Sequence, residues 1–349
     1  MARYFGGLLF GLAVLVSGGW LFISKPWTGQ AEPPTDAIPA QEKAKETEAK
    51  PARDQFAADR DDALFDAARS MTYLKSICKI GPRISGSDGM KKQQDFLKKH
   101  FENLGGKVEM QTFAAHQKSQ PRPVDMANMI VSWFPDRKRR VILCSHYDTR
   151  PIADQEPDRR KWHDPFLSAN DGGSGIALLM ELAHQMKDFK TQVGVDFVLF
   201  DGEEYIFDPQ LNHDKYFFGS EHFAHAYEKE HSKRGGSTTR YLGAVLLDMI
   251  AGKNPQFPIE QNSWELAPAL VEQLWKIAAA QGCDAFKVQD GAKVLDDHMA
   301  LNQARIPCVD IIDFDYPHWH RLTDLPENCS GDSMYQVARV LTAWLKEVK

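Results

Sequence analysis

The chain has 349 residues, of which 43% are hydrophobic, 26% charged and 11% aromatic. This composition is typical of a globular protein with a sizeable core and excludes a largely disordered chain. Asp and Glu together number 48 against 42 Lys and Arg, so the net charge is −6. A chain without a broad positive field is not expected to have nucleic acid as a partner. Five cysteines in this length exclude a small scaffold held by disulfides.

The N-terminal segment is predicted to be a leader. Residues 5–23 carry no charged side chain, and a helix of that length spans about 28 Å, close to the thickness of a bilayer core. Arg3 precedes this run and Lys25 follows it. We expect residues 1–27 to be an uncleaved signal-anchor, with a cleaved signal peptide as the alternative. The folded domain is then membrane-anchored or secreted and lies outside the cytoplasm, and the membrane is contacted through this segment only.

A linker is predicted at residues 28–54. Prolines are scattered among Ala, Glu and Lys, and Ile38 is the one apolar residue besides the alanines. Because such a segment cannot bury enough surface to offset its ordering entropy, we predict a disordered tether. Residues 55–349 are then the single folded domain.

The hydrophobic period of residues 55–349 alternates between that of strands and that of helices. Strands are predicted at 108–113, 128–133, 139–148, 193–200, 241–248 and 306–312, and helices at 58–78, 90–104, 174–186, 218–229, 267–281 and 334–346. The alternation predicts an α/β domain with a mixed, mostly parallel sheet. In such sheets, ligand sites lie at the carboxyl ends of the strands.

Five clusters of polar residues that can bind metals are expected just after predicted strands. They are His146-Tyr147-Asp148, Asn170 to Ser174, Asp201-Gly202-Glu203-Glu204, Asp248 and His318-Trp319-His320. Carboxylates from distant parts of the sequence would repel one another in one cleft unless a cation joined them. The sequence therefore predicts a metal site with mixed His and carboxylate ligands.

Four of these clusters also have a purely structural interpretation. His146 and Asp148 share one face of a strand end, where they are either a ligand with its supporting carboxylate or a simple ion pair. Asp171 opens a helix and could serve as its cap. The adjacent glutamates at 203–204 suit a metal ligand beside a proton carrier, or a plain acidic loop. His320 would complete a His/carboxylate zinc site with an open position, or lie on the surface.

Four motifs together resemble the zinc-dependent exopeptidase superfamily: ANDGGSGIALLMELA (169–183), FDGEE (200–204), FGSEHFA (218–224) and WHRLTD (319–324). Within it the chain looks most like the glutaminyl-peptide cyclotransferases (glutaminyl cyclases), because of LLDMIAGKNPQFP (246–258), DDH (296–298) and the Trp before the last His. This resemblance covers residues 64–349. It implies a three-layer αβα sandwich and zinc-dependent conversion of the N-terminal Gln of peptides or proteins to pyroglutamate, with release of ammonia.

The resemblance also implies a ligand set. Carried over position by position, Asp171, Glu204 and His320 would hold one zinc ion. The positions of His146 and Asp148 match a His-x-Asp that helps bind a second zinc in the aminopeptidase relatives, so they are a possible second metal site or support for the first.

Further roles follow from the same resemblance. Glu203 matches the residue that transfers the proton, and Asp248 and Asp296 match its supporting carboxylates. Trp319 matches the indole wall of the substrate pocket. A second aromatic wall has no clear equivalent, and the candidates are Tyr205, Phe207 and Tyr216.

Other features depart from the relatives. Residues 151–167 form a long insertion that is expected at the rim of the cleft, where Trp162 and His163 would pack or lie on the surface. The odd number of cysteines cannot pair completely, so buried free thiols are expected.

Two alternatives to the cyclase remain open. One is an aminopeptidase with two zinc ions, in which Glu203 would act as general base. The other is an inactive, membrane-tethered binding domain on the same scaffold. In each case a monomer is expected.

Overall fold

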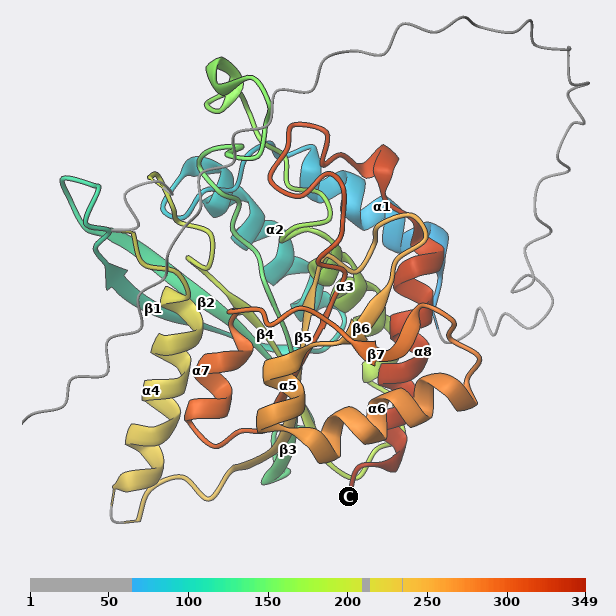
Figure 1. The fold of residues 1–349 in the computed structure, drawn as a ribbon. Coiled ribbons are helices and arrows are strands. Elements are labelled where there is room, and N and C mark those ends of the chain that lie inside the picture. Colours follow the sequence, from blue (N-terminus) through green and yellow to red (C-terminus); the bar gives the residue numbers. More distant parts are fainter. Residues whose placement is uncertain (1–64, 209–213, 234) are drawn as a thin grey trace, which may run out of the picture. The chain divides into compact units, whose positions relative to one another are not determined.

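The computed structural model describes residues 65–208, 214–233 and 235–349 (Figure 1). The predicted leader at 1–27 and linker at 28–54 lie outside these residues, so both stay predictions. Within the described ranges, every helix is too short or too polar to cross a bilayer.

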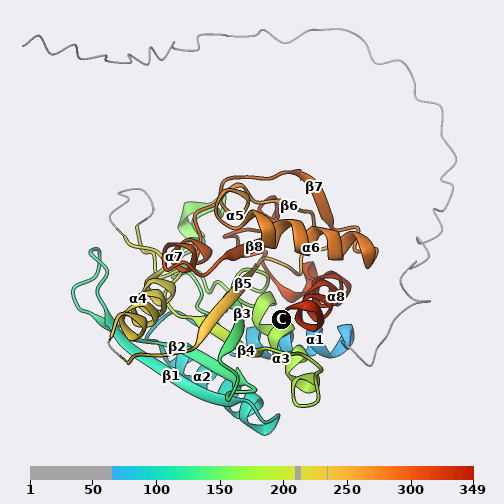
Figure 2. The ribbon, with the colours of Figure 1, turned by 90° about the horizontal axis from the view of Figure 1, so that it is seen from below.

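A six-stranded sheet forms the middle layer, with the strand order β1-β2-β4-β3-β5-β8 (Figure 2). Its strands are β1 (Lys107–Ala115), β2 (Val124–Trp133), β3 (Arg139–His146), β4 (Gly194–Phe200), β5 (Arg240–Asp248) and β8 (Cys308–Ile312). The neighbours β4, β3, β5 and β8 pair in parallel, whereas β2 is antiparallel to both β1 and β4. The predicted mixed, mostly parallel sheet is confirmed.

Helices cover both faces of this sheet, as the view from below in Figure 2 shows. One face carries α1 (Ala67–Cys78), α2 (Asp88–Asn103), α3 (Ser174–Met186), α6 (Pro268–Ala280) and α8 (Gly331–Glu347). The other carries α4 (Phe218–Ser232) and α7 (His298–Gln303), with α5 (Gln261–Leu266) beside α6. A small second sheet pairs β6 (Phe257–Ile259) with β7 (Phe286–Asp290). This is the three-layer αβα arrangement.

The alternation of side chains along the central strands builds a core on each face of the sheet. Val141 and Leu143 of β3 point into the core beneath α1, α2, α3 and α8, while Ile142 and Cys144 point into the core beneath α4 and α7. All four side chains are fully buried, as expected for a parallel strand that is covered on both faces. The five cysteines are all free and buried, as predicted.

Helix caps and hydrophobic period in the sequence predict the long helices and strands better than the short ones. Asp66 and Ser87 cap α1 and α2, because their side chains accept hydrogen bonds from Arg69 N and Met90 N. The short elements β6, β7, α5 and α7 were not predicted. Each has only three to six residues, too few for a hydrophobic period to stand out.

A buried ion pair holds the amino ends of the central strands, at the edge of the sheet away from the strands' carboxyl ends. Arg140 Nη2 lies 2.6 Å from Asp196 Oδ1, and the two side chains are 5% and 3% exposed. Further guanidinium hydrogen bonds reach the main-chain oxygens of Trp133, Phe134 and Val195. Removal of the guanidinium would leave the Asp196 carboxylate buried without a counter-charge.

We therefore expect Arg140→Ala to lower the free energy of unfolding by about 3–5 kcal/mol, since one partner of a buried pair would be left uncompensated. Urea denaturation followed by circular dichroism measures the change. The exposed neighbour Arg139 is the control, and Arg139→Ala should change stability by less than about 0.5 kcal/mol. Equal losses in the two variants would contradict this role for the buried pair.

Candidate active site

Polar side chains converge at the carboxyl ends of the parallel strands, where the fold class leads one to expect a site. His146 ends β3, Asp248 ends β5, and Glu203 and Glu204 directly follow β4. Asp171 differs from the prediction, because it lies in the turn before α3 rather than directly after a strand. The turn nevertheless brings its carboxylate to the same place.

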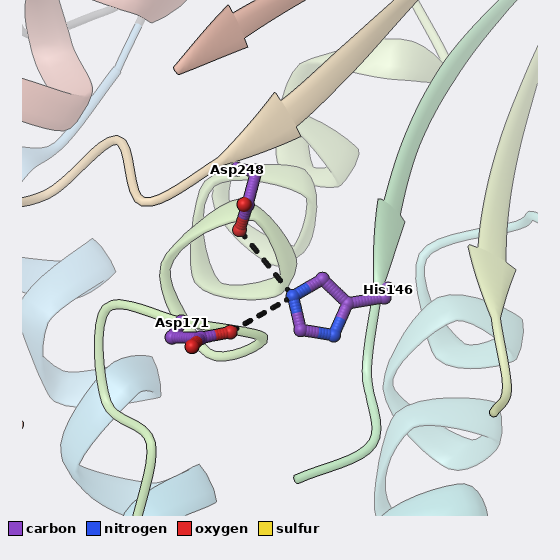
Figure 3. A group of neighbouring side chains, drawn as sticks. All are labelled: His146, Asp171 and Asp248. Atoms are coloured by element: carbon purple, nitrogen blue, oxygen red, sulfur yellow. Dashed lines mark hydrogen bonds and ion pairs between the residues drawn. The ribbon is translucent and has the colours of Figure 1, made fainter. Parts of the chain in front are cut away.

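His146, Asp171 and Asp248 form one group of possible metal ligands (Figure 3). The Nε2 atom of His146 lies 3.1 Å from Asp171 Oδ1 and 3.3 Å from Asp248 Oδ1. On the other side of the ring, Nδ1 lies 3.6 Å from Asp148 Oδ1. The imidazole is thus surrounded by carboxylates from three separate elements.

Asp171, Glu204 and His320 form a second group, which shares Asp171 with the first. The Nε2 atom of His320 lies 3.5 Å from both Asp171 Oδ2 and Glu204 Oε2. Asp171 Oδ2 and His320 Nε2 are buried and have no hydrogen-bond partner among the described residues. Buried polar atoms require a partner, and one imidazole with two carboxylates is a ligand set that suits a divalent zinc ion. The residues present therefore fit a metal ion.

The turn that carries Asp171 is held by a buried aspartate rather than by its own helix cap. The N-cap position of α3 is Gly173, and no side chain caps the helix, so Asp171 is not the capping residue. Instead, Asp324 accepts hydrogen bonds from the backbone N–H groups of Asn170 and Asp171, at 2.9 and 3.2 Å. Gly172 has a φ of 74°, and a β-carbon there would lie 2.8 Å from the His146 ring.

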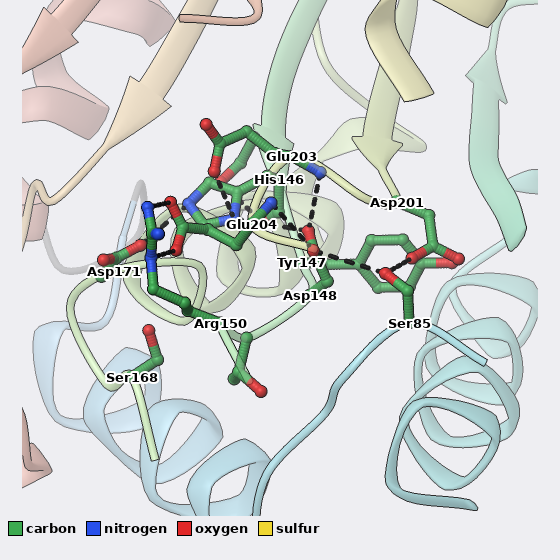
Figure 4. A network of polar contacts seen from close by, with 12 residues as sticks. Ser85, His146, Tyr147, Asp148, Arg150, Ser168, Asp171, Asp201, Glu203 and Glu204 are labelled. Atoms are coloured by element: carbon green, nitrogen blue, oxygen red, sulfur yellow. Dashed lines mark hydrogen bonds and ion pairs between the residues drawn. The ribbon is translucent and has the colours of Figure 1, made fainter. Parts of the chain in front are cut away.

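Asp148 holds the glutamate turn in the same manner (Figure 4). Its carboxylate accepts hydrogen bonds from the backbone N–H groups of Glu203 and Glu204, at 3.2 and 3.0 Å. The Ser85 hydroxyl adds a third, at 3.4 Å. Both oxygens of Asp148 are therefore engaged with the backbone of the turn, which is a supporting arrangement.

The two adjacent glutamates have opposite electrostatic surroundings. Arg150 forms a two-pronged ion pair with Glu204 (Figure 4), with its Nη2 atom 3.1 Å from Oε1. Burial alone would raise the pKa of Glu204, but the charges of Arg150 and His320 outweigh burial and hold this pKa well below its usual range. Burial and the neighbouring Glu204 charge instead raise the pKa of Glu203 well above its usual range. Such a divergence separates an ionised ligand from a proton carrier.

Two further carboxyl groups adjoin Glu203. Burial, followed by the negative charge of Asp248, raises the pKa of Asp296 well above its usual range. Burial also raises the pKa of Asp248, against the opposing effect of His146. Asp296 Oδ2 is buried and has no hydrogen-bond partner in the described ranges. Asp248 and Asp296 can therefore hold a proton near the pocket.

A pocket of about 400 Å³ is lined by most of the charged side chains described above, namely Asp171, Glu203, Glu204, Asp248, Asp296 and His320. Four aromatic residues also line this pocket: Tyr216, Phe217, Phe314 and Trp319. The rings of Trp319 and His320 have centroids 4.0 Å apart, so the indole covers the imidazole. A larger hollow of about 590 Å³ between α2 and the strands β1 and β2 is lined by neither histidine nor glutamate, so size alone does not indicate the site.

The structure distinguishes the three candidates for a second aromatic wall of the pocket. Tyr216 lines the pocket, whereas Tyr205 and Phe207 pack in a different cluster near Met126. Phe314 was missed, because the predicted strand ended before it and an isolated aromatic residue carries no pattern.

Sequence analysis also missed Arg150 and Asp154, which both line the pocket. Their side chains are 2% and 8% exposed. The available signal was their position only four and eight residues after His146, close to the strand end. Asp154 falls in the 151–167 insertion that was predicted to form the rim of the cleft.

Comparison with known proteins agrees with this geometry. The model of peptidase family M28 matches residues 128–345. A solved structure of a glutaminyl cyclase from Fimbriiglobus ruber has 53% sequence identity and a TM-score of 0.79, over 82% of this chain and 96% of that one. The chain belongs to the glutaminyl cyclases of peptidase family M28. The family resemblance of the sequence is thereby confirmed.

Other members of the family are more distant. A glutaminyl-peptide cyclotransferase-like protein from Bos taurus is 24% identical over 79% of this chain and 74% of its own length. A leucine aminopeptidase precursor from Bacteroides thetaiotaomicron has 29% identity and a TM-score of 0.75, over 82% of this chain and 98% of that one. Likeness to both kinds of protein means that the glutaminyl cyclase fold alone does not decide the reaction.

The buried carboxylates around His320 predict that metal binding stabilises the protein. Addition of Zn²⁺ to chelator-treated protein should raise the melting temperature, because a ligand at about 100 times its Kd adds about 2.7 kcal/mol of stability. His320→Ala should remove most of this rise in a differential scanning measurement. The exposed His163 is the control, since His163→Ala should keep the full rise. Equal rises in all three proteins would contradict a metal site at His320.

Proposed function

We propose that this protein is a zinc-dependent glutaminyl-peptide cyclotransferase, which converts N-terminal glutamine to pyroglutamate and releases ammonia. The observation that carries the proposal is the pair of adjacent glutamates with opposite surroundings in one pocket. Glu204 is kept ionised beside Asp171 and His320, while Glu203 has a raised pKa. The 53% identity with the cyclase from Fimbriiglobus ruber supports the same reaction.

In this proposal Asp171, Glu204 and His320 hold one zinc ion. The two buried atoms without partners, Asp171 Oδ2 and His320 Nε2, support this ligand set. When bound, zinc supplies a Lewis acid that polarises the γ-carbonyl of the substrate glutamine.

Glu203 is the proposed proton carrier. The substrate's α-amine nitrogen attacks the γ-carbonyl carbon, a C–N bond forms in a five-membered ring, and the bond to the γ-nitrogen breaks. Glu203 accepts the proton that the α-amine loses and delivers it to the departing nitrogen, which leaves as ammonia. The raised pKa of Glu203 suits this role, because it makes the carboxylate a stronger base toward the proton of the α-amine.

The remaining pocket residues support this transfer. Asp248 and Asp296 are proposed to share a proton beside Glu203, since all three line the pocket and burial raises the pKa of each. Trp319 is proposed to exclude water and to stack against the folded substrate, an arrangement that brings the amine close to the carbonyl.

The substrates are proposed to be peptide or protein N-termini outside the cytoplasm. The uncharged run at residues 5–23 supports attachment to, or passage across, a membrane.

An aminopeptidase with two zinc ions is the second candidate. The group of His146, Asp171 and Asp248 offers ligands for a second ion, and the leucine aminopeptidase precursor shares the fold. One observation favours the cyclase. The sequence identity is 53% with the Fimbriiglobus ruber cyclase and 29% with the leucine aminopeptidase precursor.

Metal content and product analysis distinguish the two candidates. We expect one equivalent of zinc in the purified protein by atomic emission, and pyroglutamyl peptide plus ammonia from a Gln-initiated peptide by mass spectrometry. Free amino acids should be absent. Two equivalents of zinc with released amino acids would favour the aminopeptidase, and the absence of both zinc and turnover would favour a binding domain. His146→Ala should keep the single equivalent.

Glu203→Gln tests the proton carrier. We expect kcat for pyroglutamate formation to fall by about 10²- to 10⁴-fold, since the amide cannot transfer the proton, while the zinc content stays unchanged. Glu228 is an exposed glutamate on α4, and Glu228→Gln should keep full activity. Loss of zinc in Glu203→Gln would mean that the roles of Glu203 and Glu204 are reversed.

A further inference from the structure

His320 has an uncommon backbone conformation for a residue with a β-carbon. Its φ is 53°, in the left-handed region that residues other than glycine seldom occupy. Conformations of this kind are unfavourable and persist only where the surrounding structure holds them. The contacts that hold His320 in place are therefore informative.

Three consecutive residues of the 151–167 insertion contact the His320 turn. The Oδ1 atom of Asp154 lies 2.8 Å from His320 Nδ1. The Gln155 N–H donates a hydrogen bond to the main-chain oxygen of His320, at 3.2 Å. The Glu156 carboxylate accepts one from the Leu322 N–H, also at 3.2 Å. The ring, the carbonyl and the following turn are thus each held from the same short segment.

The contact at Nδ1 bears on how the imidazole can bind a metal. Nδ1 of His320 and Oδ1 of Asp154 are both buried, and apart from their contact with each other neither atom has a hydrogen-bond partner in the described part of the chain. A carboxylate at Nδ1 favours the tautomer with its proton there, which leaves the lone pair on Nε2. That atom is the one that lies 3.5 Å from both Asp171 and Glu204.

Asp154 is also close to the third member of the ligand set. Its Oδ1 atom lies 3.7 Å from the Nε atom of Arg150, and Arg150 in turn forms the two-pronged pair with Glu204. One carboxylate therefore adjoins His320 directly and Glu204 through a single guanidinium. Its side chain is 8% exposed, so water screens these contacts little.

We propose that Asp154 is a positioning residue of the metal site, which fixes the tautomer and the ring orientation of His320. Residues 154–156 hold the left-handed turn that aims Nε2 at Asp171 and Glu204. The 151–167 insertion is then part of the metal site and does more than form the rim of its pocket. This inference rests on the proposed metal-binding role of His320.

The test measures zinc affinity by competition with a chromophoric chelator, on the whole chain, without any assay of turnover. Asp154→Ala should bind zinc about 10- to 100-fold more weakly, the loss typical when such a supporting carboxylate is removed. Asp154→Asn should lose less, because its amide oxygen can still accept the Nδ1 proton but carries no charge. Asp158 lies in the same insertion and caps its short helical turn, and Asp158→Asn should bind zinc like the parent protein.

Two further measurements separate positioning from a general structural role. The melting temperature of the chelator-treated Asp154→Asn protein should equal that of the chelator-treated parent. The visible spectrum of the Co²⁺-loaded Asp154→Asn protein should differ from that of the loaded parent, since the His320 ring would be less constrained. An unchanged Co²⁺ spectrum together with zinc affinity within twofold of the parent would overturn the inference.

The outcome for the parent protein distinguishes failure of this inference from failure of the proposed function. If the parent protein binds no zinc, both the proposed metal site and the proposed role of Asp154 are overturned. A parent that binds zinc, beside an Asp154→Ala protein of equal affinity, would overturn only the positioning role. A parent that binds zinc but forms no pyroglutamate would leave the role of Asp154 supported by the affinities while the proposed cyclase reaction failed.

Discussion

Repulsion between buried carboxylates is the constraint on which the rest of this structure depends. Asp171, Glu203, Glu204 and Asp248 gather within one pocket, and the side chains of all four are at most 12% exposed. Negative charges in such a space are stable only if cations or protons accompany them. Arg150 accompanies Glu204, whereas the raised pKa of Glu203 means that this group readily holds a proton. The donor atoms around His320 that lack partners are where a metal ion fits.

The fold places these charges by using other aspartates as structural anchors. Asp148 and Asp324 each accept hydrogen bonds from two consecutive backbone N–H groups, in the turns that carry Glu204 and Asp171. A carboxylate that bonds to backbone amides cannot move without breaking two charge-assisted hydrogen bonds. The proposed ligands Glu204 and Asp171 are thereby held in place through their backbone, as precise metal sites require. Asp148 illustrates that a carboxylate close to the proposed metal ligands can hold the backbone of a neighbouring turn.

The sequence predicted the long elements and most of the site because both follow from local patterns. The continuous apolar run of β3, which is buried on both faces of the sheet, is visible in the sequence. The strand ends then indicated where His146 and Asp248 would meet. Short elements such as α5 escaped prediction, since their formation depends on tertiary partners. The contact between Asp154 and His320 joins residues far apart in the chain and leaves no periodic signal.

By itself the sequence determined the fold class, the family, and many of the side chains that meet at the carboxyl ends of the strands. These properties follow from hydrophobic period and from motif spacing, which are local. Only the tertiary structure decided how two adjacent and chemically identical glutamates differ. Arg150 reaches Glu204 from 54 positions away, while Glu203 is left in a buried, acidic environment. A pKa is set by burial and by charges within a few ångströms, and those distances exist only once the chain has folded.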